Sequence, residues 1–181
     1  MAPLMRLVGK GPSNKNPNFC GDCLTKTPIG GAEIELSLLF ADVRGSTGLA
    51  QRLRPVEFAA YMNKFYSAGT DVLIRTDALI DKFMGDEVIG LYTPGFAGPN
   101  HADRAVQAAQ ELLRATGHAD SEGPSLSVGI GVHTGVAYVG TVGSEAAVSD
   151  VTVLGDVANT TARLASAAGP GEILVSDAAR L

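Results

Sequence analysis

The chain has 181 residues, enough for one domain with a sizeable hydrophobic core and too few for two domains of ordinary size. Its formal net charge of −5 disfavours a nucleic-acid partner, because a surface that binds phosphates needs clustered basic residues. No apolar run approaches the ~18 to 20 residues of a membrane span, and the first residues lack the basic-then-apolar order of a secretory signal. We therefore expect a cytoplasmic domain without membrane contact.

Residues 1–32 are rich in Gly, Pro, Asn, Ser and Lys, and this composition predicts a poorly ordered or loosely packed lead segment before a single domain over 33–181. The segment contains both cysteines, Cys20 and Cys23. A zinc site normally needs four ligands, and no second Cys or His pair lies nearby. We interpret the pair as a reduced turn; a zinc ion shared between two chains is the alternative.

The first half of the domain predicts a strand, a helix and a hairpin. Residues 34–43 alternate apolar and polar side chains and then become wholly apolar, as in a strand that ends buried, and a polar turn containing glycine follows. Pro55 suits the first position of a helix whose aromatic residues recur at helical spacing. Residues 78–92 read as a hairpin with its turn at Gly85 and Asp86.

The second half predicts a helix, paired strands, a helix and a strand. Asn100 can cap a helix with one apolar stripe. Alternation from Leu126 to Val132 predicts a strand, with a paired strand over 136–142, a helix over 157–168 and a strand over 173–175. Helices interleaved with strands indicate one α+β domain with its helices on one face of a sheet.

Two carboxylates are the candidate metal ligands. Asp42 stands where the first strand enters its turn, and Asp86 stands at the hairpin tip. Either alone is more simply an ordinary turn residue. Together, at rigid strand ends, they suit Mg²⁺ or Mn²⁺ holding a polyphosphate. The backbone N–H groups of the next five residues offer an anion-binding concavity: Val43, Arg44, Gly45, Ser46 and Thr47.

The last predicted helix has a polar pair opposite its apolar stripe. Asn159 and Arg163 are four residues apart, so their side chains stack on one side of the helix. If the apolar stripe packs on the sheet, this pair points outward. An amide and a guanidinium one turn apart can grip sugar and phosphate oxygens, although such a pair by itself is usually a solvated face.

Three segments in this order carry a family resemblance. They are Phe-Ala-Asp-Val-Arg-Gly-Ser-Thr at 40–47, Asp-Lys-Phe-Met-Gly-Asp-Glu at 81–87, and Thr-Val-Leu-Gly-Asp-Val-Ala-Asn-Thr-Thr-Ala-Arg-Leu at 152–164. Their sequence and spacing resemble the class III adenylyl/guanylyl cyclase catalytic domain over about residues 34–181. The resemblance implies a ferredoxin-like α+β nucleotidyl cyclase fold and a head-to-tail homodimer.

The resemblance also implies roles for six residues: the metal-binding Asp42 and Asp86, the base-reading Lys82 and Thr152, and the catalytic Asn159 and Arg163. It implies that Asp42, Lys82 and Asp86 come from one chain. Thr152, Asn159 and Arg163 would come from its partner. Lys82 can donate to adenine N1 and Thr152 can accept from the N6 amino group, whereas guanine inverts both positions. We therefore expect an adenylyl cyclase that converts ATP to 3′,5′-cyclic AMP and pyrophosphate with two divalent metal ions.

Several alternatives stay open. A non-catalytic, cyclase-like regulatory module loses one or more of the six positions, and all six are filled here. The run Met-Gly-Asp-Glu-Val at 84–88 is similar to the turn of diguanylate cyclases, but it lacks their first glycine. A guanylyl cyclase should carry an acceptor where Lys82 stands. Asp156 either helps to read the base or caps the last helix, and Arg44 is a candidate cation for the terminal phosphates, which relatives hold with a later lysine.

Overall fold

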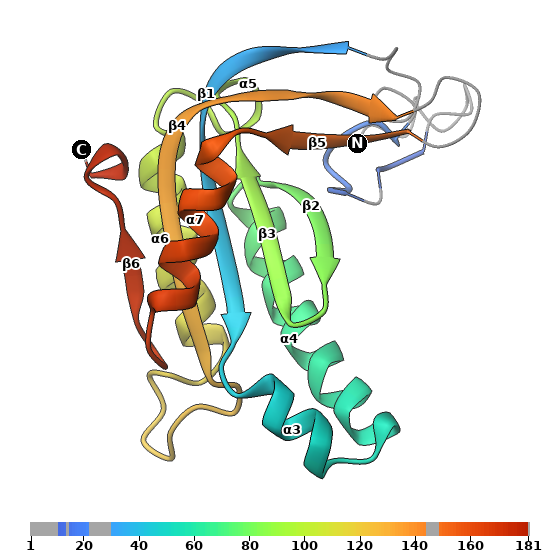
Figure 1. The fold of residues 1–181 in the computed structure, drawn as a ribbon, viewed down its shortest axis with the longest axis vertical. Helices are drawn as coiled ribbons and strands as arrows, with labels where there is room; N and C mark the ends of the chain where they lie inside the picture. The colour runs from blue at the N-terminus through green and yellow to red at the C-terminus, as the bar shows by residue number, and fades with distance from the viewer. Residues whose placement is uncertain (1–10, 14, 22–29, 144–148, 181) are drawn as a thin grey trace.

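The computed structural model describes residues 11–13, 15–21, 30–143 and 149–180 (Figure 1). A mostly antiparallel, curled sheet has the order β2-β3-β1-β4-β5, and β6 pairs in parallel with β4. The strands are β1 (Gly30–Val43), β2 (Leu79–Met84), β3 (Glu87–Tyr92), β4 (Val128–Gly143), β5 (Ser149–Leu154) and β6 (Ile173–Val175). The predicted hairpin is present, and the two strands predicted from Leu126 to 142 form one long strand, β4.

The helices are α3 (Ser46–Arg52), α4 (Pro55–Arg75), α5 (Pro94–Ala97), α6 (His101–Ala115), α7 (Asp156–Ala167) and the 3-10 turn η1 (Asp177–Ala179). Helix α4 begins at Pro55 as predicted, whereas the short α3 was expected to be only a turn. Within the described ranges, none of these helices is both long enough and apolar enough to cross a bilayer. The combination of these helices with a mostly antiparallel sheet confirms the predicted α+β class.

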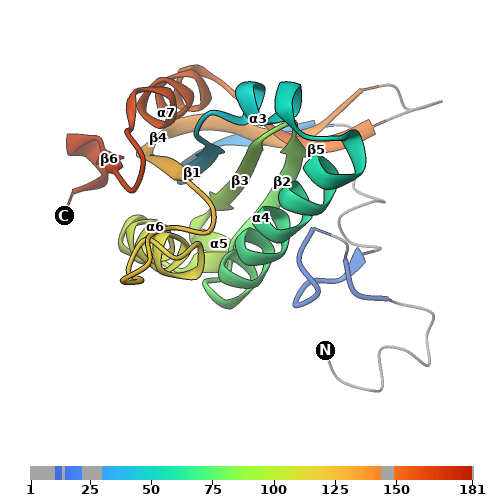
Figure 2. The ribbon, with the colours of Figure 1, turned by 90° about the horizontal axis from the view of Figure 1, so that it is seen from below.

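The sheet carries a hydrophobic core on each face. Leu39 and Val43 of β1 belong to the core under α4 and α6, while Leu38 and Phe40 face the core under α7. Figure 2 shows α7 on one side of the sheet and α4 and α6 on the other. The expectation that the helices share one face is therefore wrong, because alternate residues of β1 are buried on both sides.

Glycines on β4 let α7 approach the second face. A Cβ atom at Gly131 would lie 2.6 Å from the carbonyl oxygen of Thr161, and one at Gly129 would lie 2.7 Å from that of Ala168. Both are too close for any other residue, so the helix backbone packs directly on the strand backbone. The alternating glycines of β4 place α7 on this face.

The described part of the lead segment packs against the sheet. Asn16 is fully buried, and its Nδ2 donates to the carbonyl oxygen of Ala78 at 2.8 Å. The Ile80 N–H donates to the Lys15 carbonyl oxygen at 3.0 Å. Lys15 and Asn16 are therefore packed against the domain, whereas Gly11, Pro12, Pro17 and Asn18 are exposed, and the description of the lead segment as a whole stays a prediction. Cys20 is half-buried, and Cys23 lies outside the described residues, so the interpretation of the pair stays a prediction.

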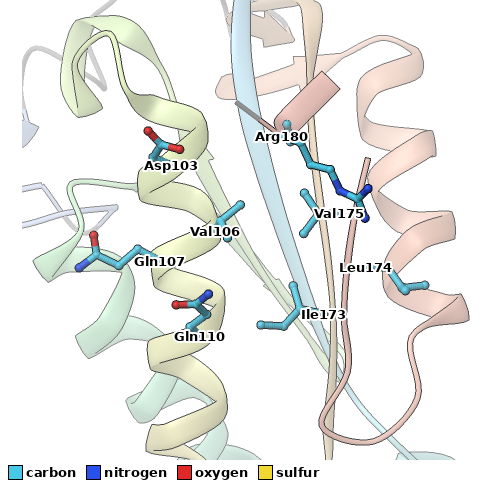
Figure 3. Close-up of a pocket in the computed structure, with 9 residues that line it drawn as sticks. Asp103, Val106, Gln107, Gln110, Ile173, Leu174, Val175 and Arg180 are labelled. Atoms are coloured by element: carbon cyan, nitrogen blue, oxygen red, sulfur yellow. The ribbon is translucent and has the colours of Figure 1, made fainter. Parts of the chain in front are cut away.

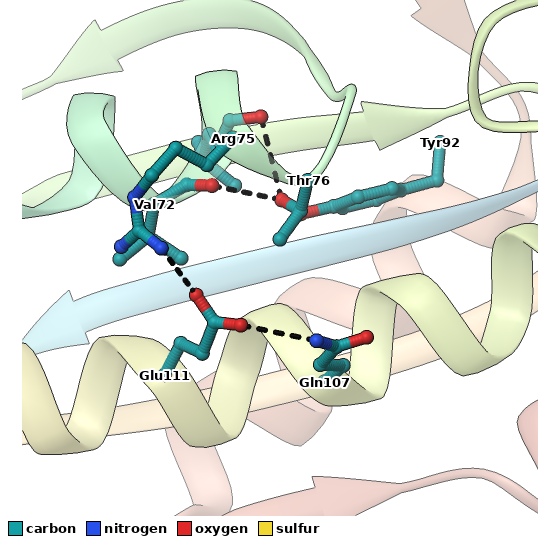
Figure 4. A network of polar contacts seen from close by, with 7 residues as sticks. Val72, Arg75, Thr76, Tyr92, Gln107 and Glu111 are labelled. Atoms are coloured by element: carbon teal, nitrogen blue, oxygen red, sulfur yellow. Dashed lines mark hydrogen bonds and ion pairs between the residues drawn. The ribbon is translucent and has the colours of Figure 1, made fainter.

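A buried tyrosine links α4 to the sheet (Figure 4). The hydroxyls of Tyr92 and Thr76 are 2.8 Å apart, and Thr76 Oγ1 itself donates to the Val72 carbonyl oxygen at 2.9 Å. The Tyr92 hydroxyl is therefore the donor of the shared bond. Burial raises the pKa of Tyr92 well above its usual range, so the phenol stays neutral. Arg75 and Glu111, 2.9 Å apart, join α4 to α6 beside it.

We expect Tyr92→Phe to lower the free energy of unfolding by about 1 kcal/mol, because it removes one net hydrogen bond and leaves the Thr76 oxygen without its donor. Urea denaturation of the two proteins measures the difference. Tyr61→Phe is the matched control, since Tyr61 is half-buried on α4, the helix that the Tyr92 hydroxyl joins to the sheet. Equal destabilisation by the two changes would contradict a role for the Tyr92 hydroxyl.

Candidate active site

The two predicted metal ligands lie at one end of the sheet. Asp42 is the penultimate residue of β1, and Asp86 lies in the turn between β2 and β3. The Val43 N–H donates to the Asp86 carbonyl oxygen at 3.0 Å. Asp42 also pairs directly with Glu87 across the β1–β3 ladder. The structure therefore brings together the two carboxylates that the sequence predicted, and adds Glu87 as a third acid beside them.

These acids repel one another. Burial raises the pKa of Asp42, and the charge of Asp86 raises it further, while the Arg44 guanidinium opposes both effects. Burial, followed by the charges of Asp42 and Asp86, likewise raises the pKa of Glu87. A divalent cation would relieve this repulsion, and two carboxylates suit Mg²⁺ or Mn²⁺. In the described parts of the chain no three His, Cys, Asp or Glu side chains are grouped so that they could hold one metal ion, so Glu87 is not counted as a ligand and water or phosphate would complete the coordination.

Neighbouring groups hold the turn of Asp86. The Ser46 hydroxyl donates to the Asp86 carboxylate, and the Tyr66 hydroxyl donates to the Gly85 carbonyl oxygen. Ser46 is buried at the start of α3, and Tyr66 reaches across from α4. The sequence offered no signal for Tyr66 beyond its place in the apolar spacing of that helix, because its contact depends on how α4 crosses the hairpin.

The predicted anion concavity is smaller than expected. The Val43 N–H is bound to Asp86, and the Arg44 N–H donates to the Ser127 carbonyl oxygen at 2.8 Å. Two of the five predicted donors are thus already used within the chain. The N–H groups of the other three predicted residues, Gly45, Ser46 and Thr47, open α3 and remain the candidate phosphate contacts.

The Arg44 side chain faces the chain's own oxygens. Its guanidinium forms an ion pair with Asp42 and donates to the carbonyl oxygens of Ser166 and Ala168, at 3.2 Å and 3.3 Å, at the end of α7. This arrangement joins the metal-ligand candidate to α7. The role of Arg44 as a cation for the terminal phosphates stays a prediction.

The polar pair on α7 points outward as predicted. Asn159 and Arg163 are exposed, whereas Val157, Thr161 and Ala165 are buried against the sheet. Asp42 is opposite Gly129 in the ladder, and Val157 lies against Gly135 of the same strand. Six residues of strand span about 20 Å. The start of α7, where Asn159 lies, is therefore far from the carboxylates of its own chain.

The strands of the two predicted base readers meet within one chain. Lys82 lies in β2, with its side chain outside the described part, and the half-buried Thr152 lies in β5. The Lys15 ammonium is 2.9 Å from the carbonyl oxygen of Asp81 and 3.1 Å from that of Val151. The backbone beside Lys82 therefore lies close to the backbone beside Thr152. The implied division, in which Lys82 and Thr152 belong to different chains, stays a prediction.

Asp156 is the first residue of α7, and Gly155 occupies the capping position with a φ of 141°. The expectation that Asp156 is the N-cap is therefore wrong. A glycine adopts this backbone conformation without strain, whereas Asp156 begins the helix itself. Its exposed carboxylate lies where the helix dipole favours negative charge.

A cavity of about 540 Å³ lies elsewhere, between α6 and β6 (Figure 3). Val106, Ile173 and Val175 form its apolar wall, and Asp103, Gln107 and Arg180 lie at its rim. None of the six predicted site residues lines it. The cavity is therefore separate from the site at the end of β1.

Known proteins with similar sequences include cyclases. The chain is 30% identical over 138 residues to an adenylate cyclase of Anabaena cylindrica, covering 71% of this chain and 26% of that protein. It is 29% identical over 135 residues to adenylate cyclase 1 of Rhizobium meliloti, covering 72% of this chain and 20% of that protein. The matched region thus spans about a quarter of the length of these relatives.

Solved structures with the same fold include cyclases of both base specificities. The guanylyl cyclase Cya2 superimposes with a TM-score of 0.76 at 29% identity, covering 83% of this chain and 79% of that one. The adenylyl cyclase CyaB from P. aeruginosa superimposes with a TM-score of 0.72 at 27% identity, covering 83% and 81%. Both specificities therefore occur on this fold.

The family description "Adenylate and Guanylate cyclase catalytic domain" matches residues 32–181, which is most of the chain. The match includes all six predicted site residues, from Asp42 to Arg163. It agrees with the resemblance carried by the three sequence segments and with the similarity to solved cyclase structures. The chain belongs to the class III family of adenylyl and guanylyl cyclase catalytic domains.

Proposed function

We propose that this domain is an adenylyl cyclase that converts ATP to 3′,5′-cyclic AMP and pyrophosphate at the interface of a homodimer. The observation that carries the proposal is the pair Asp42 and Asp86 at one end of the sheet, held together by the Val43 N–H, with Glu87 beside them and Arg44 paired with Asp42. Membership of the cyclase family supplies the reaction class.

In the proposed reaction the ribose 3′ oxygen attacks the α-phosphorus. The new O–P bond forms as the bond to pyrophosphate breaks, and the hydroxyl proton passes to water or to a phosphate oxygen. Divalent cations, when bound by Asp42 and Asp86, lower the pKa of the attacking hydroxyl and neutralise the triphosphate. Arg163 stabilises the charge that develops at the α-phosphate, and Asn159 orients the ribose.

Two chains are needed to complete this site. Asn159 and Arg163 point away from the sheet face against which α7 packs, and the start of α7 is remote from the carboxylates of the same chain. A second chain that presents its α7 to Asp42 and Asp86 removes this separation. A symmetric dimer then has two equivalent sites.

The choice of ATP rests on Lys82 and Thr152. A lysine donor suits adenine N1, and a threonine acceptor suits the adenine amino group. Because β2 and β5 meet through Lys15, we propose that one chain supplies both residues together with Asn159 and Arg163, while the partner supplies both aspartates. This division replaces the one implied by the sequence resemblance.

The decisive experiment incubates the purified protein with Mn²⁺ or Mg²⁺ and either ATP or GTP, then separates the products by chromatography. We expect cyclic AMP in clear excess over cyclic GMP. Cyclic GMP in excess would instead identify a guanylyl cyclase. This alternative is supported by the similarity to the guanylyl cyclase Cya2. A folded dimer that makes neither product would support the non-catalytic module.

A further inference from the structure

The lead segment bridges the two edges of the main sheet path. Strands β2 and β5 stand at opposite ends of the order β2-β3-β1-β4-β5, so they share no ladder with each other. The Lys15 ammonium donates to the Asp81 carbonyl oxygen on β2 and to the Val151 carbonyl oxygen on β5, at 2.9 Å and 3.1 Å. One side chain from outside the sheet thus joins its two edges.

The bridge is charged and largely shielded from water. Lys15 also lies 3.5 Å from the Asp81 carboxylate, and the two side chains are only 17% and 8% exposed. Hydrogen bonds from a charged donor in such a setting are stronger than those between neutral groups. The bridge therefore holds the separation of β2 and β5 firmly.

Several contacts fix Lys15 in this position. Its carbonyl oxygen accepts from the Ile80 N–H at 3.0 Å, which continues the edge of β2. The neighbouring Asn16 is fully buried against Ala78, and the Phe19 ring lies 4.3 Å from that of Phe96. The ammonium is therefore positioned by a packed loop.

We propose that Lys15 is a positioning residue for recognition of the nucleotide base. The two carbonyl groups that it binds belong to the residues immediately before Lys82 and Thr152, the base readers of the proposed function, on which this inference rests. Lys15 itself lies outside the residues matched by the cyclase family. The lead segment is thus part of the base-binding end of the site.

The proposed role of Lys15 concerns binding of the base and not the chemical step. The candidate metal ligands Asp42 and Asp86 lie at the end of β1 and in the turn between β2 and β3, whereas the Lys15 ammonium binds the carbonyl oxygens of Asp81 and Val151. Loss of the ammonium frees β2 from β5, so Lys82 and Thr152 lose their fixed spacing. KM for ATP and the preference for ATP over GTP should change more than kcat.

The test compares Lys15→Met, Lys15→Arg and Lys64→Met in the full chain. Methionine keeps most of the side chain's length and apolar contact while it removes the charge. Arginine restores a charged donor, and Lys64 is an exposed lysine on α4 that serves as the matched control. Each protein is assayed with ATP and GTP, and its thermal unfolding and dimer content are measured in parallel.

We expect Lys15→Met to raise KM for ATP about tenfold and to reduce the ratio of kcat/KM for ATP over GTP, with a smaller change in kcat. Lys15→Arg should recover part of both losses, and Lys64→Met should match the unmodified protein. An unchanged KM and ratio in folded Lys15→Met protein would overturn the proposal. So would a uniform loss of kcat alone, which indicates only a structural role.

Two further measurements keep the outcome clear. If Lys15→Met does not fold, the milder Lys15→Gln variant takes its place under the same criteria. Binding of non-hydrolysable α,β-methylene analogues of ATP and GTP is also measured by calorimetry, without turnover. If the unmodified protein makes no cyclic nucleotide, the proposed function has failed. In that case the role of Lys15 is supported only if Lys15→Met weakens binding of the ATP analogue more than binding of the GTP analogue.

Discussion

Asp42→Ala is expected to reduce cyclic nucleotide formation by on the order of a thousandfold. Bound metal ions stabilise the transition state by several kcal/mol, and each ~1.4 kcal/mol changes the rate tenfold. The fold should tolerate the change, because burial and Asp86 raise the pKa of Asp42 and so make its charged form unfavourable in the folded chain. Initial rates with ATP and Mn²⁺, together with thermal unfolding, measure both effects.

Asp71→Ala provides the control for this experiment, since Asp71 is an exposed carboxylate on α4 away from the site. It should leave the rate within a factor of two of the unmodified protein, as expected for a surface substitution. If the folded Asp42→Ala protein retained most of its activity, this carboxylate could not be an essential metal ligand. The proposed two-metal site would then be wrong.

Mixing two inactive variants should restore activity. Asn159→Ala chains keep both aspartates, and Asp42→Ala chains keep the helix pair. If each site is shared between chains, a mixed dimer has one intact site and one doubly defective site. With equal amounts and free exchange, about a quarter of the activity of the unmodified protein should return. The rate of the mixture, compared with that of each variant alone, measures this recovery.

Two control mixtures show which residues one chain supplies. Asp42→Ala with Asp86→Ala should restore nothing, because every site then lacks one of its two aspartates. Lys82→Ala with Thr152→Ala should also give no recovery, because β2 and β5 of one chain lie together. Recovery in this last mixture would contradict the proposed division of the site. If the mixture of Asp42→Ala and Asn159→Ala chains failed to recover activity although dimers were present, a site shared between chains would be excluded.

Local patterns in the sequence predicted most elements of the fold. The alternation before Asp42, the hairpin around Asp86 and the helix after Gly155 all appear in the structure at nearly the expected positions. The outward orientation of Asn159 and Arg163 followed from helical spacing alone. Such features depend on residues within one or two turns of each other, so a single segment contains the information.

Contacts between distant segments were not predictable in this way. The burial of Asn16, the link from Tyr66 to the Asp86 turn and the ion pair of Arg44 with Asp42 all depend on how separate elements cross. Even the face occupied by α7 was mispredicted, although the glycines of β4 were visible in the sequence. A periodic pattern shows that a face is buried without showing which element covers it.

The sequence by itself determined the class of fold, the cyclase family and the six candidate residues, because these lie in short segments with characteristic spacing. Only the tertiary structure decided that β2 and β5 meet and that Lys15 joins them. The reason is physical: the curl of a sheet accumulates over all its strands, and no single segment encodes where its two edges come together.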